Sequence, residues 1–143
     1  MSRKIEFFIV DIFIATDKIK RYCKPFTDAE AFLHSELEWD AVIRELEIIG
    51  EATNKLLQEK VLDTQYRMIV DFRNQILHGY FGIDENIVWE VVTTLLDEFK
   101  ATLSSLVQTQ DINLSDAIAS AKEDHHYNSK TLTLLDKLSQ KHP

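Results

Sequence analysis

The scarcity of glycine and proline is the feature that most restricts how this chain can fold. Only three glycines and two prolines occur among its 143 residues. A β-sandwich or barrel needs many tight turns, and glycine and proline supply the backbone conformations of those turns. Their scarcity therefore favours a few long helices joined by short links. A chain of this length has the size of one domain, large enough to bury a self-supporting core.

Apolar residues recur at the three-and-four spacing of amphipathic helices along much of the chain. The pattern predicts long helices over residues 4–23, 39–60, 63–78 and 84–106, and a shorter helix that Thr27 and Glu30 begin as a capping box. Asp84 is the expected N-cap of the last long helix. Gly50 lies inside a predicted helix, where glycine costs about 1 kcal/mol relative to alanine, so we expect another helix to approach closely there.

The predicted fold class is all-α. Four main helices with short connections pack as an antiparallel four-helix bundle, and a short additional C-terminal helix through Leu132 and Leu138 follows it. We assign residues 1–108 to the bundle and residues 109–143 to a C-terminal extension, either part of the same domain or peripheral to it.

Composition limits the classes of function. Lysine and arginine number 16 and aspartate and glutamate 24, so the net charge is −8. An acidic chain does not bind nucleic acid through its overall field, so any RNA contact must be local. Glu6 and Asp11 interrupt the apolar N-terminal run, and no stretch approaches the roughly 20 apolar residues of a membrane span. We expect a soluble protein without membrane association.

The single cysteine, Cys23, cannot form an intrachain disulfide. That fits a reducing compartment and a cytoplasmic location, with Cys23 as a small buried hydrophobic residue. One thiol and scattered histidines do not make a zinc site, and the adjacent His125 and His126 rarely share one ion. We therefore predict no metal and no cofactor.

Chemistry-bearing residues concentrate in the octapeptide 73–80, which holds Arg73, Asn74, His78 and Tyr80. At 100° per residue, Arg73 and Tyr80 project from nearly the same helix face, whereas His78 lies about 140° from Arg73. Arg73 and His78 can therefore act on one ligand if the helix ends near His78. Alternatively, a second subunit supplies the partner group across a twofold axis.

These side chains suit cleavage of an RNA phosphodiester. Arginine stays charged and binds phosphate oxygens in bidentate fashion, and an imidazole takes up or releases a proton near neutral pH. The neighbouring 2′-hydroxyl is an internal nucleophile. The spacing of Arg73 and His78 is by itself a weak signal, however. A histidine at the negative end of a helix and an arginine that reaches a surface carboxylate would look the same.

The wider sequence resembles a known family. Arg73 and Asn74, then His78 and Tyr80, resemble the Arg-x4-His-x-Tyr signature of the HepT toxins in the HEPN superfamily. Residues 44–52 (RELEIIGEA) are similar to a helix of that family, and residues 81–84 (FGID) with 88–90 (VWE) are similar to the turn and last helix that follow its signature. The resemblance covers residues 4 to 106.

The resemblance implies a homodimer of four-helix bundles whose signatures line a shared cleft. It also implies a metal-independent endoribonuclease, the toxin of a type VII-like toxin–antitoxin pair. The implied partner is an MntA-type minimal nucleotidyltransferase antitoxin that transfers AMP from ATP to Tyr80. Bulk and negative charge beside the phosphate site would then block cleavage.

Carried over residue by residue, the resemblance implies that Arg73 binds the scissile phosphate and His78 acts as general acid or base. Asn74 orients one of them, and Glu51 holds Arg73 or His78, or is instead a solvated or interface charge. An alternative function is a non-catalytic accessory subunit that presents Tyr80 to the nucleotidyltransferase. A third, weaker one is a nucleotide-binding protein that uses Arg73 for phosphate.

Overall fold

The computed structural model describes residues 3–78 and 83–143, and every regular element within those ranges is helical. The predicted all-α class is confirmed. The main elements are α1 (Ile5–Cys23), α3 (Glu36–Gln58), α4 (Arg67–Leu77) after a 3-10 turn (Thr64–Tyr66), and a continuous helical run of α5 (Glu85–Glu90), a π-helical segment (Val91–Leu95) and α6 (Leu96–Thr109). Their bounds lie close to those that the apolar periodicity predicts.

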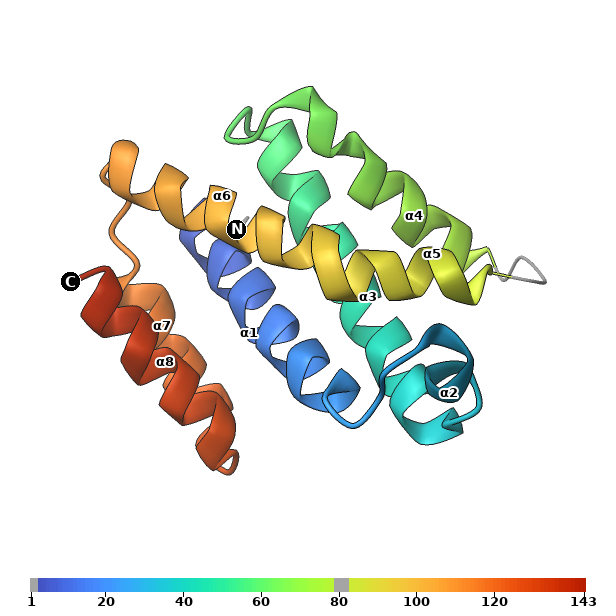
Figure 1. The fold of residues 1–143 in the computed structure, drawn as a ribbon. Helices are drawn as coiled ribbons and strands as arrows, with labels where there is room; N and C mark the ends of the chain where they lie inside the picture. The colour runs from blue at the N-terminus through green and yellow to red at the C-terminus, as the bar shows by residue number, and fades with distance from the viewer. Residues whose placement is uncertain (1–2, 79–82) are drawn as a thin grey trace.

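The helices pack so that α1 and α4 contact α3, and α6 crosses α1 (Figure 1). The fully buried side chains on these helices include Ile9, Ile12, Ile49, Leu56 and Leu103. The buried positions of α1 include the unbroken run 12–16, because this helix contacts α3 as well as α6, α7 and α8 and is buried on more than one face. This burial, more than helix propensity, stabilises the arrangement.

The short helix α2 (Ala29–Leu33) begins one residue later than the predicted capping box. Asp28, not Thr27, is its N-cap, and the Asp28 carboxylate accepts a hydrogen bond of 2.8 Å from the Ala31 amide. The expectation of Thr27 as the cap was wrong because the helix begins at Ala29, which puts Asp28 at the N-cap position, where aspartate is at least as favourable as threonine. Phe32 of α2 is fully buried, with its ring centroid 5.8 Å from that of Trp89, which joins α2 to α5.

The helical run after the signature begins as predicted. The Asp84 carboxylate accepts a hydrogen bond of 2.8 Å from the Asn86 amide and so caps α5. After α5 the helix widens into one π-helical turn, where the Thr93 hydroxyl donates to the Trp89 carbonyl at 2.6 Å. Such π-helical turns often occur at functional sites, and this one borders an apolar groove whose other walls are α3 and α4.

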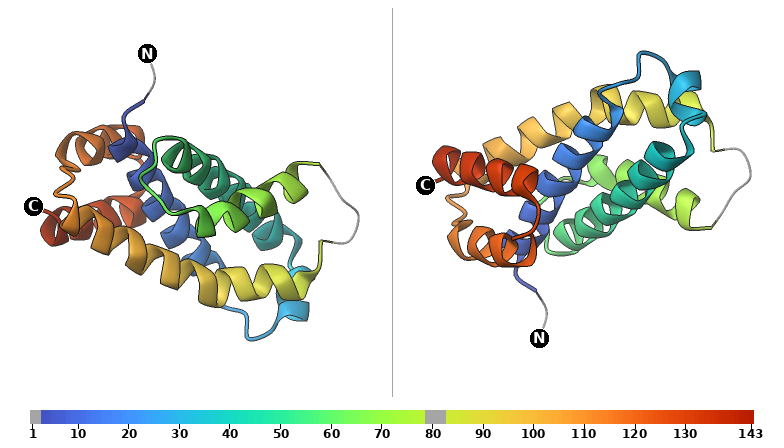
Figure 2. Two further views of the ribbon diagram at one scale, coloured as in Figure 1. Left: turned by 90° about the horizontal axis from the view of Figure 1, so that it is seen from above. Right: turned by 90° about the horizontal axis from the view of Figure 1, so that it is seen from below.

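The C-terminal extension contains two helices rather than the single short one expected. Both α7 (Ser115–Asp124) and α8 (Ser129–Lys141) contact α1, and they form a hairpin on the side of α1 away from α4 (Figures 1 and 2). The helix α7 was missed because alanines fill much of its buried face, so its apolar period is faint. Ala117 is 1% exposed and packs as a core residue.

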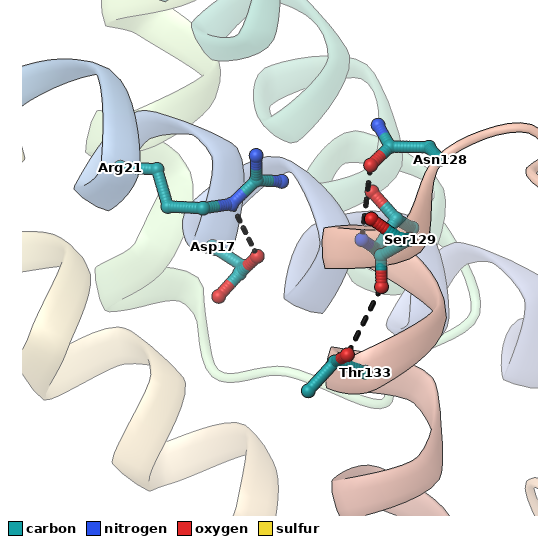
Figure 3. A network of polar contacts seen from close by, with 6 residues as sticks. Asp17, Arg21, Asn128, Ser129 and Thr133 are labelled. Carbon is teal, nitrogen blue, oxygen red and sulfur yellow. Dashed lines mark hydrogen bonds and ion pairs between the residues drawn. The ribbon is translucent and has the colours of Figure 1, made fainter.

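Polar contacts stabilise α8 and hold its C-terminal end. Asn128 caps α8 by accepting a hydrogen bond from the Thr131 amide, and within α1 Arg21 pairs with Asp17 (Figure 3). At the other end, His142 is buried, and its Nε2 lies 3.1 Å from the Ser104 hydroxyl of α6. This contact anchors the C-terminal end of α8 to α6.

Candidate active site

The signature residues stand at the C-terminal end of α4. Arg73 lies at the end of its penultimate turn and Asn74 begins the last one, and the helix ends at Leu77 with His78 as its C-cap. The His78 amide still donates a hydrogen bond of 3.1 Å to the Asn74 carbonyl, so the backbone is helical from Arg73 up to His78. Five residues of helix separate them by about 7.5 Å along the axis. Because the His78 amide is still in helical register, its side chain leaves the axis about 140° from that of Arg73, so action of both on one ligand stays a prediction.

The position of Arg73 depends on a close approach of α3. A Cβ atom placed on Gly50 would overlap the Cβ of Arg73 and lie 2.5 Å from its Cγ. Only a residue without a side chain fits there, which explains the glycine inside α3 despite its cost in helix propensity. The expected close helix contact at Gly50 is confirmed, and its partner is the arginine of the signature.

The head of Arg73 is also held. Its Nη1 donates a hydrogen bond of 2.8 Å to the Asn74 Oδ1, and both side chains are half-buried. This bond leaves the remaining guanidinium donors available for an anion, since guanidinium carries five N–H groups. The stem of Arg73 is thus positioned by α3 and its head by Asn74, an arrangement suited to holding one phosphate group in a fixed place.

His78 is solvent-exposed at the helix end. Tyr80, the expected AMP acceptor, lies outside the described residues. The geometry therefore presents a fixed cation and an accessible imidazole on one helix terminus.

Glu51 lies on a different surface from the one that the resemblance suggests. It is exposed and lines a hollow between α1 and α3, together with Lys18 and Arg44. No hydrogen bond or ion pair within residues 3–78 and 83–143 joins Glu51 to Arg73. A supporting role for Glu51 at Arg73 or His78 stays a prediction.

An apolar groove beside the signature escaped the sequence analysis. It has a volume of about 480 Å³ and lies between α3, α4 and the π-helical run. Phe72 and Gln75 of α4 line it, and two apolar side chains on its rim, Met68 and Ile87, are 53% and 51% exposed. The sequence offered only a faint signal, because each of these residues also fits the core-facing stripe of its helix.

Two further features were sought, a cluster of metal ligands and a helix able to span a membrane. Within residues 3–78 and 83–143, no group of three or more His, Cys, Asp and Glu side chains could hold a metal ion. The helices in the same ranges are all too short or too polar to cross a membrane.

Comparison with known proteins agrees with this site. The sequence profile of the family described as Ribonuclease HepT-like matches residues 12–106, which include all of α3 and α4. The chain belongs to this family of HepT-like ribonucleases. The C-terminal hairpin lies outside the matched residues.

Individual relatives bear similar names. The chain is 32% identical to "Putative RNase MJ0125" of Methanocaldococcus jannaschii, over 75% of this chain and 94% of the relative. It is 30% identical to "Probable ribonuclease HepT" of Thermococcus cleftensis, over 74% of this chain and 98% of the relative. No solved structure matches the chain.

Proposed function

We propose that this protein is a metal-independent endoribonuclease toxin whose reaction takes place at Arg73 and His78. The observation that carries the proposal is the double support of Arg73, by Gly50 behind its stem and by Asn74 at its head, on a helix that ends at His78. Membership of the HepT-like ribonuclease family supports RNA as the substrate.

The chemistry needs only the substrate and these side chains. The 2′-oxygen attacks the adjacent phosphorus, the bond from phosphorus to the 5′-oxygen breaks, and a 2′,3′-cyclic phosphate and a 5′-hydroxyl form. Arg73 binds the non-bridging oxygens and stabilises the charge that develops on them. His78 removes the 2′-hydroxyl proton or protonates the leaving 5′-oxygen. In a dimer, the imidazole of the second copy serves the other proton transfer.

A cleavage assay on total RNA tests this proposal. Arg73→Ala and His78→Ala should each lose at least about 100-fold in activity, the scale of a single general acid–base or electrostatic contribution. Arg44→Ala and His126→Ala, which change exposed residues elsewhere, should cleave like the unchanged protein. A chelator should have no effect. Equal cleavage by the unchanged protein and both signature variants would place the activity outside this site.

We further propose that a second copy of the chain covers the groove beside the signature. The half-exposed Met68 and Ile87 on its rim provide apolar surface whose burial would favour association, and the groove borders α4 itself. Sedimentation of Met68→Lys and Ile87→Lys should show monomers. Leu37→Lys changes a side chain that is 78% exposed and outside the groove, and it should leave the dimer intact.

Regulation in the cytoplasm acts on the same site. We propose that an MntA-type nucleotidyltransferase antitoxin modifies Tyr80: the phenolic oxygen attacks the α-phosphorus of ATP, and pyrophosphate leaves. Intact mass after co-expression with the neighbouring nucleotidyltransferase gene should show added AMP units. Tyr80→Phe should abolish them, whereas Tyr127→Phe, at a tyrosine that is 74% exposed, should not. AMP retained in Tyr80→Phe would contradict the proposal.

The net charge of −8 favours one alternative, a non-catalytic subunit that presents Tyr80 to the nucleotidyltransferase. A growth assay distinguishes the nuclease from the accessory subunit. Expression without the antitoxin should arrest growth if the chain is a nuclease, and His78→Ala should relieve the arrest. An accessory subunit would be harmless in both forms.

A further inference from the structure

A second hollow lies along the seam between α1 and α3, with a volume of about 330 Å³. Apolar side chains of both helices, among them Phe8, Ile14 and Ile48, line part of it, and His125 at the end of α7 closes one side. Neither Arg73 nor His78 lines this hollow. Although Glu51 lines it, the hollow is therefore separate from Arg73 and His78, and a ligand bound there is independent of the cleavage chemistry proposed for them.

A buried carboxylate without a partner lines this hollow. Glu45 is only 8% exposed, and its carboxylate makes no hydrogen bond or ion pair within the part of the chain that the structure describes. Burial raises the pKa of Glu45, and the positive charges of Lys18, Arg44 and Arg21 oppose that rise. A carboxylate partly withdrawn from water is stabilised when a donor group binds it. The Glu45 carboxylate is thus a hydrogen-bond acceptor without a donor in the described residues, and it lines a hollow large enough for a small ligand.

Two further polar groups of the same hollow also lack partners in the described ranges. Lys18 influences Glu45 electrostatically yet forms no ion pair with it or with another carboxylate. His125 Nδ1 is buried without a hydrogen bond. An acceptor and a cationic donor therefore face one space without meeting each other. The space between Glu45 and Lys18 fits a molecule that carries a donor for the first and an acceptor for the second.

We propose that this hollow binds a small zwitterion of the α-amino-acid class. Its ammonium donates to Glu45, its carboxylate accepts from Lys18, and its aliphatic side chain packs on Phe8 and Ile48. A simple amine would leave Lys18 unpaired, and a simple carboxylate would face the negative charge of Glu45. A volume of about 330 Å³ lies at the small end of the range of ligand pockets, as suits a single amino acid.

The site also joins the two parts of the chain. Lys18 and Glu45 belong to the segment that matches the HepT-like family, whereas His125 belongs to the hairpin outside it. The hollow is complete only while the hairpin is docked on α1. Because a ligand stabilises the state that binds it, the amino acid favours the docked hairpin.

Calorimetry on the full chain tests the site, with alanine, valine and leucine as probes. Two fragments of leucine are the matched ligands: 3-methylbutylamine lacks the carboxylate, and 4-methylpentanoate lacks the ammonium. At least one amino acid should bind at millimolar concentration. When leucine binds, each fragment should bind about ten-fold more weakly or worse, since each loses one charge-assisted hydrogen bond. No heat from any amino acid, or fragments that equal leucine, would overturn the proposal.

Variants locate the binding. Glu45→Gln and Lys18→Met should each weaken amino-acid binding by about ten-fold. Glu59→Gln and Lys55→Met, which change exposed residues outside the hollow, should leave it unchanged. Circular dichroism checks that each variant is folded, and Lys18→Met still decides the matter if Glu45→Gln fails to fold. Unchanged binding in a folded Glu45→Gln or Lys18→Met protein would overturn the assignment. Arg73→Ala should bind the amino acid normally even though it is expected to lose cleavage.

Discussion

The Cβ of Arg73 lies directly against Gly50, so α3 and α4 approach each other closely where the arginine of the signature leaves its helix. A side chain at position 50 of α3 would push the two helices apart. Gly50, 23 positions earlier in the chain, thus positions Arg73. It does so because it has no side chain and lets α4 approach, and not by forming a bond with the arginine.

Replacement of Gly50 by alanine should therefore destabilise the protein. Alanine is the better helix former by about 1 kcal/mol, but the overlap with Arg73 amounts to overpacking, which costs about 1–3 kcal/mol. We expect urea denaturation to show a net loss of up to about 2 kcal/mol in the free energy of unfolding. Because Arg73→Ala keeps the offending Cβ, adding it to Gly50→Ala should not restore stability fully. A more stable Gly50→Ala protein would show that α4 moves aside freely.

Asn74 should matter for activity through Arg73. Its Oδ1 accepts the only side-chain hydrogen bond that the described residues make with the guanidinium. In Asn74→Ala the arginine keeps its charge but loses this restraint, so cleavage should fall by about ten-fold, the value of one hydrogen bond to a charged group. Kinetic assays should show little change for Gln58→Ala, an exposed amide on α3. Full activity in Asn74→Ala would mean that Gly50 alone positions Arg73.

Cys23 should be inert in the folded protein. Burial raises the pKa of its thiol to about 11, and the side chain is 9% exposed. At about pH 8 only roughly one such thiol in a thousand is the reactive thiolate. A chromogenic disulfide reagent should therefore react slowly with native protein and quickly after denaturation in guanidinium. Rapid labelling of the native state would show that α1 opens near its C-terminal end.

His142 should make the attachment of the C-terminal hairpin sensitive to acid. Burial, and to a smaller extent Lys141, lowers the pKa of His142 below the usual value of 6.5. The unfolded chain then binds a proton more readily than the folded one, so stability falls as the pH drops below the unfolded pKa. Urea denaturation at about pH 7.5 and about pH 5.5 should show this loss.

The variant His142→Gln should lose less stability between these two pH values than the unchanged protein does. Some loss remains, because burial and Lys18 also lower the pKa of His125. His34→Gln, at an exposed histidine, is the matched control and should behave like the unchanged protein. An identical pH dependence in His142→Gln would exclude the Ser104 contact as its source.

Local features of the chain were predictable from its sequence. Helical periods, the Asp84 cap and the end of α4 before Gly79 depend on residues within a few positions of one another, so their physical signals lie in the linear sequence. The family resemblance was also visible there, since it depends on residue types at fixed spacings. Fold class and family are thus properties that the order of residues alone determines.

Relations between distant segments required the tertiary structure. Gly50 predicts a close contact but not its partner, and only packing shows that the partner is Arg73. Packing also turns Glu51 toward the α1–α3 hollow and places Glu45 there without a partner. The physical reason is that which helix faces meet depends on how side chains far apart in sequence share one core, and no local spacing encodes that.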